Sequence, residues 1–274
     1  MRVVTRNMRR ANAKSPAWGY LFDVKPDIAL LQEVSEIPKE IKIIYDARRL
    51  PSTGKPNNTL KFGTAILVKW KILKEFSLTS NLAWVNEEIK KYSGNLTCYT
   101  IKPDNYPEIN VMPAYSPVYE IDTSKYPQNE VDQLDGSHYD DLWLTDIIRA
   151  GLKDTDLKST PRIVAWDFNS SETFDSEWQQ ANGIKSGFSS DGNKQFLDDM
   201  KDLWFVECLR QRNNDKIIPT FRHSRGKAIH QLDHMFVTKD IASNLISCNV
   251  ENIFDKKLSD HLPIVADFEE KKSD

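Results

Sequence analysis

The sequence predicts a mixed α/β fold in which sheets are buried between other layers. Nine apolar runs of strand length recur along the chain, and several of them are apolar on both faces. Three segments with helical spacing lie between some of these runs. Because a strand with two apolar faces must be covered on both sides, the sheets should lie between other layers. With 274 residues and 39% hydrophobic side chains, the chain can bury a sizeable core.

The expected elements follow from these runs in chain order. Strands are expected at RVVT (2–5), DIALLQ (27–32), FGTAILV (62–68), LTCYTI (96–101), INVMPAY (109–115), RIVAW (162–166), LDHMFV (232–237), ISCNV (246–250) and LPIVADF (262–268). Helices are expected at SPAWGYLFDV (15–24), YDDLWLTDIIRAGL (139–152) and QFLDDMKDLWFVECLR (195–210). The stretch 116–138 has no clear period and is expected to form a long loop.

The organisation of the chain indicates one domain. No repeat, low-complexity tract or Gly/Ser linker interrupts it, so residues 1–268 are predicted to form a single domain, followed by a charged tail at 269–274. The three cysteines are widely spaced and form no CxxC pair, which favours neither a disulfide framework nor a zinc site. There is no apolar run of membrane-spanning length and no signal-peptide core. A monomer in the cytoplasm is expected.

Charge is distributed unevenly. The net charge of −3 argues against a protein that coats nucleic acid by bulk charge, but it allows a local basic groove. Residues 1–62 and 205–234 are rich in Lys and Arg, whereas residues 116–146 hold eight Asp/Glu against one Lys. The two basic segments and the acidic one would bear on the binding of any anionic substrate.

Two polar side chains follow the expected strand 162–166. Asp167 and Asn169 come directly after the apolar run, with Phe168 between them. Since successive side chains of an extended chain point to opposite faces, Asp167 and Asn169 share one face, and Trp166 lies on the other with Phe168. The simplest interpretation is a turn or a helix cap, because Asp and Asn favour both.

The same pattern recurs at four other expected strands, which favours a functional interpretation. If these strand ends meet, the site collects Asn7, Glu33, Asp167, Asn169, Asp233, Asp260 and His261. Carboxylates packed this closely repel one another and raise one another's pKa. A cation would resolve the conflict, and oxygen donors without cysteine favour Mg²⁺ first, then Mn²⁺ or Ca²⁺. The residues therefore predict metal-assisted attack of water on a phosphate ester.

Five motifs in order give the sequence a family resemblance. TRN, LLQEV, AWDFN, QLDHMFV and SDHLPIV span the chain from Asn7 to His261. Together they resemble the endonuclease/exonuclease/phosphatase superfamily, which includes deoxyribonuclease I and exonuclease III. The resemblance implies a four-layer α/β/β/α sandwich and Mg²⁺-dependent hydrolysis of phosphate esters, with Mn²⁺ as a substitute. It also implies that Glu33 is the main metal ligand, with Asn7 and Asp260 nearby.

The resemblance implies roles for five further residues. Asp167 would orient or deprotonate the attacking water, and Asn169 would help to place the water and the phosphate. His261 would contact the scissile phosphate, while Asp233 would hold its imidazole ring. Tyr115 stands where the exonuclease III-like branch has Tyr, so it could bond the phosphate or assist the leaving group.

The sequence also departs from the family pattern. Trp166 stands where the family usually has Gly, and we expect it to pack in the core. Gln231 stands where Arg is frequent, and an aromatic-rich insert for an abasic-site pocket is not evident. The segment PTFRHSRGKAIHQLD (219–233) instead offers Arg222 and Arg225, which with Arg9 could bind substrate phosphates. These departures argue against a dedicated abasic-site endonuclease.

Three functions remain open at this point. The favoured one is a nuclease that acts on DNA rather than RNA. A phosphatase or phosphodiesterase of a phosphorylated lipid or small molecule is the alternative, which the acidic stretch 116–146 favours because it would repel a long polyanion. A catalytically inactive binding domain fits less well, since such a domain has no need to retain both a metal ligand and a base.

Overall fold

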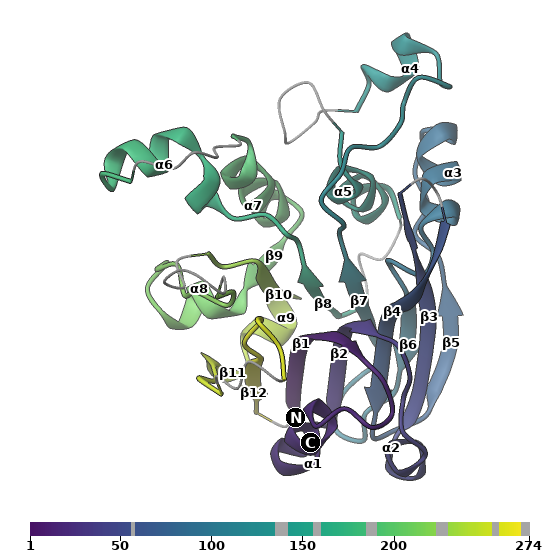
Figure 1. Cartoon of the computed structure of the whole chain (residues 1–274), viewed down its shortest axis with the longest axis vertical. Coiled ribbons are helices and arrows are strands. Elements are labelled where there is room, and N and C mark those ends of the chain that lie inside the picture. The colour runs from purple at the N-terminus through teal and green to yellow at the C-terminus, as the bar shows by residue number, and fades with distance from the viewer. Residues whose placement is uncertain are drawn as a thin grey trace.

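Two sheets packed face to face, with helices on their outer faces, form the four-layer α/β fold that the family resemblance implies (Figure 1). The structure is a computed structural model that describes residues 1–55, 58–134, 142–155, 160–184, 191–222, 230–253 and 258–269. Met1 and Phe268 lie side by side, where the amino group of Met1 donates to the carbonyl oxygen of Phe268 (2.7 Å).

Sheet A holds six strands. Its order is β11 (Leu245–Val250), β12 (Ile264–Phe268), β1 (Arg2–Ala11), β2 (Ile28–Val34), β4 (Asn58–Val68) and β3 (Asp46–Gly54). Strands β1 and β2 run parallel, and the other neighbours are antiparallel.

Sheet B also holds six strands. Its order is β5 (Ile72–Phe76), β6 (Cys98–Ile101), β7 (Ile109–Tyr115), β8 (Arg162–Asp167), β10 (Asp233–Thr238) and β9 (Phe205–Glu207). Strands β7 and β8 run parallel, so the carboxyl ends of these two strands lie at the same edge of the sheet.

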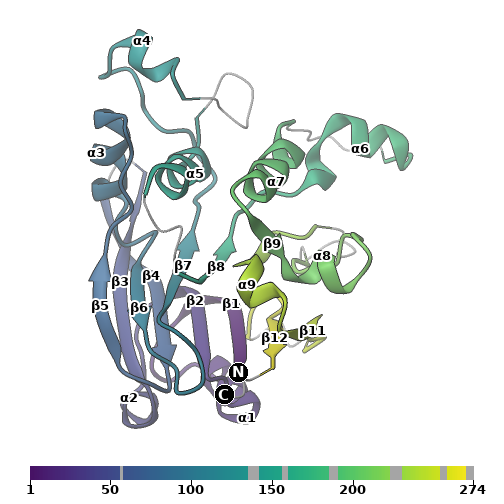
Figure 2. The ribbon, with the colours of Figure 1, turned by 180° about the vertical axis from the view of Figure 1, so that it is seen from behind.

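Helices cover the outer face of each sheet. On sheet A these are α1 (Ala17–Val24) and α2 (Lys39–Ile44); on sheet B they are α3 (Ala83–Lys91), α5 (Leu144–Asp154) and α7 (Asn193–Asp202). The remaining helical elements are α4 (Gln128–Val131), η1 (Glu172–Phe174), α6 (Ser176–Ala181), α8 (Cys208–Arg212) and α9 (Lys239–Ala242). Figure 2 shows α8 and α9 beside β9, and both helices also pack against β10, where they close the inter-sheet core. Within the described ranges, no helix combines the length and apolar character needed to cross a bilayer.

Strand alternation decides which side chains face the gap between the sheets. In β8, Ile163 and Ala165 join the inter-sheet core, whereas Val164 and Trp166 join the core under the helices of sheet B. Asp167 lies two residues after Ala165, so its carboxylate points to the same side as Ile163 and Ala165, into the gap between the sheets. Trp166 is fully buried and stacks on Phe168, with ring centroids 4.1 Å apart. The expectation that Trp166 packs in the core is therefore confirmed.

The helix expected over residues 195–210 is wrong in its second half. Helix α7 ends at Asp202, and the chain turns at Trp204, whose φ is 68°. Residues 205–207 then form β9 along β10, and α8 begins at Cys208. A short apolar run fits both a helix and a strand. Here residues 205–207 form a strand because the backbone groups at the free edge of β10 need hydrogen-bond partners. A continuous helix over 195–210 would leave those groups of β10 unpaired.

Strands β3 and β5 lie at the outer edges of the two sheets and were not expected from the sequence. Both expose much of their surface, and β3 carries Arg48, Arg49 and Pro51. An edge strand with polar residues lacks the continuous apolar run that marks a central strand, and proline is tolerated there. The apolar runs from which the central strands were predicted are therefore missing from these two strands.

The described part of the long stretch 116–138 contains α4 and is held against α3 by a buried carboxylate. Glu88, on α3, is fully buried and accepts a hydrogen bond from the hydroxyl of Tyr126 (2.8 Å). The ammonium groups of Lys125 and Lys91 lie 2.9 and 3.0 Å from its two oxygens. The indole of Trp84 donates to the carbonyl oxygen of Glu130 (3.2 Å). The segment thus lies over the outer layer of sheet B.

We expect Glu88→Gln to lower the free energy of unfolding by about 3 kcal/mol, the lower end of the range for breaking a buried ion pair. The lower end applies because Lys125 is half exposed and can return to water. Urea unfolding measures the change. The control is Glu87→Gln, an exposed neighbour on α3 that should stay within about 0.5 kcal/mol of the parent protein. Equal stability of the two variants would contradict this role of Glu88.

Candidate active site

Polar side chains from both sheets meet at one edge of the sandwich. The register of sheet B places Tyr115 beside Asp167 and Asp167 beside Asp233. From sheet A, the amide of Asn7 donates to Asp167 Oδ2 (2.8 Å). This hydrogen bond joins β1 to β8 across the gap between the sheets, although the two residues are 160 positions apart in the chain.

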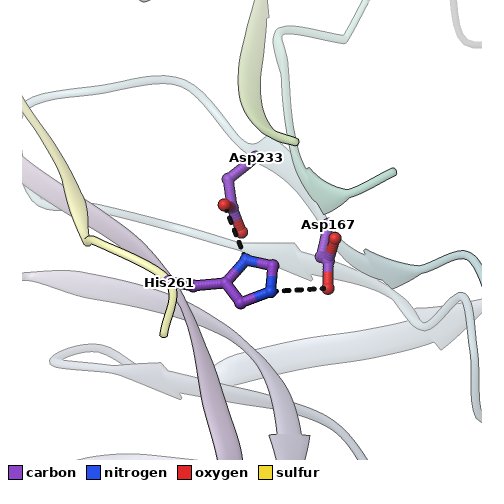
Figure 3. Close-up of side chains that lie close together, drawn as sticks. All are labelled: Asp167, Asp233 and His261. Carbon is purple, nitrogen blue, oxygen red and sulfur yellow. Dashed lines mark hydrogen bonds and ion pairs between the residues drawn. The ribbon is translucent and has the colours of Figure 1, made fainter. Parts of the chain in front are cut away.

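A buried histidine lies between two of these carboxylates (Figure 3). His261 Nδ1 is 2.8 Å from Asp233 Oδ2, and His261 Nε2 is 4.0 Å from Asp167 Oδ2. All three side chains are buried, and their potential ligand atoms lie within 4.8 Å of one another. The ring of Phe221 lies against the imidazole at 5.0 Å between centroids.

Two hydroxyl groups position these residues, and neither was assigned a role from the sequence. Thr220 Oγ1 accepts hydrogen bonds from the backbone of Leu232 and Asp233, each at 3.0 Å. Ser259 Oγ accepts from the backbone N–H of His261 (3.1 Å) and donates to the carbonyl oxygen of Asn7 (2.8 Å). Thr220 belongs to the segment 219–233, but nothing in the sequence marked it as a residue that positions others. Ser259 was visible inside SDHLPIV, but only its backbone contacts reveal what it does.

Burial and charge shift the acid–base properties of the cluster. Burial raises the pKa of Asp167 above its usual range, and the carboxylate of Asp233 raises it further, while His261 and the amide of Asn7 oppose the shift. Burial lowers the pKa of His261, but Asp233 and Asp167 outweigh it and raise that pKa to about 10. His261 therefore carries a proton at neutral pH.

Glu33 reaches the same edge through an irregularity in β2. The pairing of β2 with β4 shifts register between Leu31 and Val34, and Glu33 has a φ of 51°. A bulge of this kind re-aims a side chain that regular alternation would direct elsewhere. The pKa of Tyr115 is raised, first by burial and then by the charge of Glu33 and a hydrogen bond to Glu33. The hydroxyl of Tyr115 therefore stays protonated. The guanidinium of Arg10 lies 3.8 Å from the carboxylate of Glu33.

Strained backbone also gathers here. Arg9, Arg10, Glu33 and Asn169 all have a positive φ, between 49° and 58°. The side chain of Asn169 donates to the carbonyl oxygen of Ser116 (2.9 Å), and its backbone N–H donates to Asp167 Oδ1 (3.1 Å). Non-glycine residues in this region persist only where their surroundings hold them, and they cluster at functional sites.

The donor set fits a hard divalent cation. Glu33 and Asp260 offer carboxylate oxygens, and both side chains are partly accessible. Asn7 Oδ1 accepts from the backbone N–H of Arg9 (2.8 Å), which leaves one lone pair for a ligand. Asp233 Oδ1 has no hydrogen-bond partner among the residues that the structure describes. A donor set of oxygen atoms without thiol ligands suits Mg²⁺ better than Zn²⁺.

The structure describes two of the three arginines that were expected to bind phosphate. Arg9 is exposed and directly follows the site residues of β1. Arg222 is also exposed, and its backbone N–H donates to the carbonyl oxygen of Asp260 (3.0 Å). Arg225 lies outside the described residues.

Comparison with known proteins decides the family. The model of the endonuclease/exonuclease/phosphatase family matches residues 4–261. The chain belongs to this family. This endonuclease/exonuclease/phosphatase protein is therefore a phosphoric ester hydrolase. A search of curated protein sequences finds no match.

Several solved structures share this fold. The family member is similar to an AP endonuclease from Archaeoglobus fulgidus (21% identity, TM-score 0.64, covering 98% of this chain and 99% of that one). It is also similar to the APE2 catalytic domain from Xenopus laevis (13%, 0.66, 98% and 91%). A third is the 3′ phosphatase NExo from Neisseria bound to a product DNA hairpin (17%, 0.62, 98% and 99%). At these identities the likeness concerns the fold.

Proposed function

We propose that this protein is a Mg²⁺-dependent phosphodiesterase that cleaves nucleic acid, with DNA favoured over RNA. The observation that carries the proposal is the arrangement of Asn7, Asp167, His261 and Asp233 at one sheet edge, joined by two hydrogen bonds and one ion pair, with Glu33 beside it. Asp167 supplies a carboxylate that can take a proton, and protonated His261 supplies a positive charge that can face a phosphate. Glu33 and Asn7 supply oxygen donors for a metal.

The residues divide the chemistry between them. Glu33, Asn7 and Asp260 would hold Mg²⁺ or Mn²⁺, which when bound would stabilise negative charge on the phosphoryl oxygens. Asp167 would orient the attacking water and take its proton, because burial gives its carboxylate a raised pKa and hence more basic character. Asn169, held by Ser116, would help to place the water and the phosphate.

Two proton-bearing groups complete the site. His261, fixed by Asp233 through Nδ1, would direct its protonated Nε2 to the scissile phosphate. Tyr115 keeps its proton because burial and Glu33 raise its pKa. Its hydroxyl could therefore donate to a phosphate oxygen or to the leaving oxygen.

The structure weakens the case for a small-molecule or lipid substrate. The start of the acidic stretch lies at the site, where Ser116 contacts Asn169. From Lys125 to Glu130 the chain is held against α3 by Glu88 and Trp84. Glu130, in this described part of the stretch, is therefore held on the outer side of sheet B and is poorly placed to repel a polyanion from Asp167. A compared structure described as bound to a DNA hairpin also favours nucleic acid.

We also propose a cellular compartment and an oligomeric state for the protein. The cysteines Cys98, Cys208 and Cys248 are free and buried, which fits the reducing cytoplasm. We propose that the protein acts as a monomer and is not dedicated to abasic sites.

We expect cleavage of oligonucleotides and of bis(p-nitrophenyl) phosphate with Mg²⁺, its loss in EDTA, and its recovery when Mg²⁺ or Mn²⁺ is restored. Cleavage of the oligonucleotide should weaken steeply with salt, because many phosphate contacts release counterions, whereas the small ester should respond little. Rates measured on DNA, RNA and nitrophenyl phosphates test this. Turnover in EDTA would contradict the requirement for a metal. Cleavage of small esters alone would favour a small-molecule or lipid substrate. No turnover at all would favour a catalytically inactive binding domain.

A further inference from the structure

A second feature of the molecule is a pocket that opens beside Tyr115. Its volume is about 660 Å³, within the range of roughly 300–1,000 Å³ that is usual for small-ligand pockets. Its walls come from β4 and from the segment that follows β7, including Phe62 and Val118. Apart from Tyr115, the residues that line it have no role in the mechanism proposed above.

The pocket combines aromatic walls with cations. Phe62 and Tyr119 contribute rings, and Val118, which is 60% exposed, extends the apolar surface. The guanidinium of Arg10 lies 4.9 Å from the ring centroid of Phe62, and Lys55 Nζ lies 5.9 Å from that of Tyr119. Lys61 is a further exposed cation of the lining. A ligand that carries both a flat apolar group and negative charge would match this surface.

The pocket is continuous with the candidate active site. Tyr115 lines the pocket and is also paired with Asp167 in the register of sheet B. The rings of Phe62 and Tyr115 meet edge to face at 6.0 Å. Arg10 reaches from the pocket to within 3.8 Å of Glu33. A chain whose phosphate lies at the catalytic residues could therefore place its neighbouring unit in the pocket.

We propose that this pocket holds the nucleotide next to the scissile phosphate with its base unpaired. The base would lie against Tyr119 and Val118, and Lys55 and Lys61 would attract the following phosphates. Since a base can present its face to a protein ring only after leaving the duplex stack, the pocket makes single-stranded nucleic acid, or an unpaired end, the preferred substrate. This inference rests on the proposed phosphodiesterase function and specifies its substrate class.

Steady-state kinetics on one sequence as single strand and as duplex test the proposal, with methyl p-nitrophenyl phosphate as a substrate that lacks a base. We expect Tyr119→Ala to raise KM for the single strand at least about fivefold, the lower limit for losing one base–aromatic stack. The value of kcat and the small-ester kinetics should stay unchanged. Tyr119→Phe loses the hydrogen bond from the hydroxyl to the carbonyl oxygen of Thr53 (3.1 Å). Because it keeps the ring on which the base would stack, it should retain the parent KM.

A surface variant guards against misfolding of Tyr119→Ala. Val118→Glu places a negative charge on the exposed pocket wall and should also raise KM for the single strand. Leu73→Glu is the matched control, because Leu73 is 52% exposed on β5, at the end of sheet B opposite Tyr115. It should leave KM unchanged.

Different failures have different meanings. An unchanged KM in both pocket variants, or an equal loss on the small ester, would overturn the nucleotide pocket while leaving the phosphodiesterase function intact. Preferred cleavage of duplex by the parent protein would also overturn it. Preference for a phosphorylated lipid over any oligonucleotide, or no phosphodiesterase activity in the parent protein, would overturn the proposed function itself and this inference with it.

Discussion

Asp167→Asn is expected to lower kcat by roughly 10²–10⁴-fold, the usual contribution of a general base. The amide has nearly the same shape as the carboxylate, so the hydrogen bond with Asn7 can persist. What the variant loses is the ability to take a proton from water. The measurement is the Mg²⁺-dependent rate on an oligonucleotide and on bis(p-nitrophenyl) phosphate.

Stability measurements separate this chemical effect from misfolding. Because burial already disfavours the charged form of Asp167, the amide variant should be at least as stable as the parent protein. Asp104→Asn, an exposed carboxylate, provides a matched control that should leave both rate and stability unchanged. A folded Asp167→Asn protein with the parent rate would remove Asp167 from the mechanism.

Asp233→Asn is expected to have the second large effect, about 10²–10³ in kcat, because His261 would lose the proton through which it contacts the scissile phosphate. The charge of Asp233 and its hydrogen bond raise the pKa of His261, so their removal lets burial lower it. At neutral or mildly alkaline pH less of the imidazole would then carry a proton.

The sign of the pH dependence follows from this shift. In the parent protein His261 stays protonated until the pH approaches about 10, so the alkaline limb of the rate profile should lie at high pH. In Asp233→Asn the limb should move to lower pH. NMR titration of His261 in the metal-free protein measures the pKa directly. If the pKa remains as high in the variant, Asp233 does not control the charge of His261.

The sequence anticipated the central strands because their apolar runs are a local property. A strand covered on both faces must be apolar on both, and β1, β2, β7, β8, β10 and β12 all show this pattern. Edge strands such as β3 have one face toward water, so nothing in their own composition required a strand. The segment 205–207 is a strand only because β10 offers it backbone partners.

The candidate site divides in the same way. The sequence by itself placed Asn7, Asp167 and Asp233 at the ends of strands and Asp167 on the face opposite Trp166, since a side-chain period of two needs no knowledge of the fold. Only the tertiary structure brought Asn7 to Asp167 across the two sheets, re-aimed Glu33 through a bulge, and opened the pocket beside Tyr115. These features depend on distances between segments far apart in the chain, and no local pattern of residues encodes such distances.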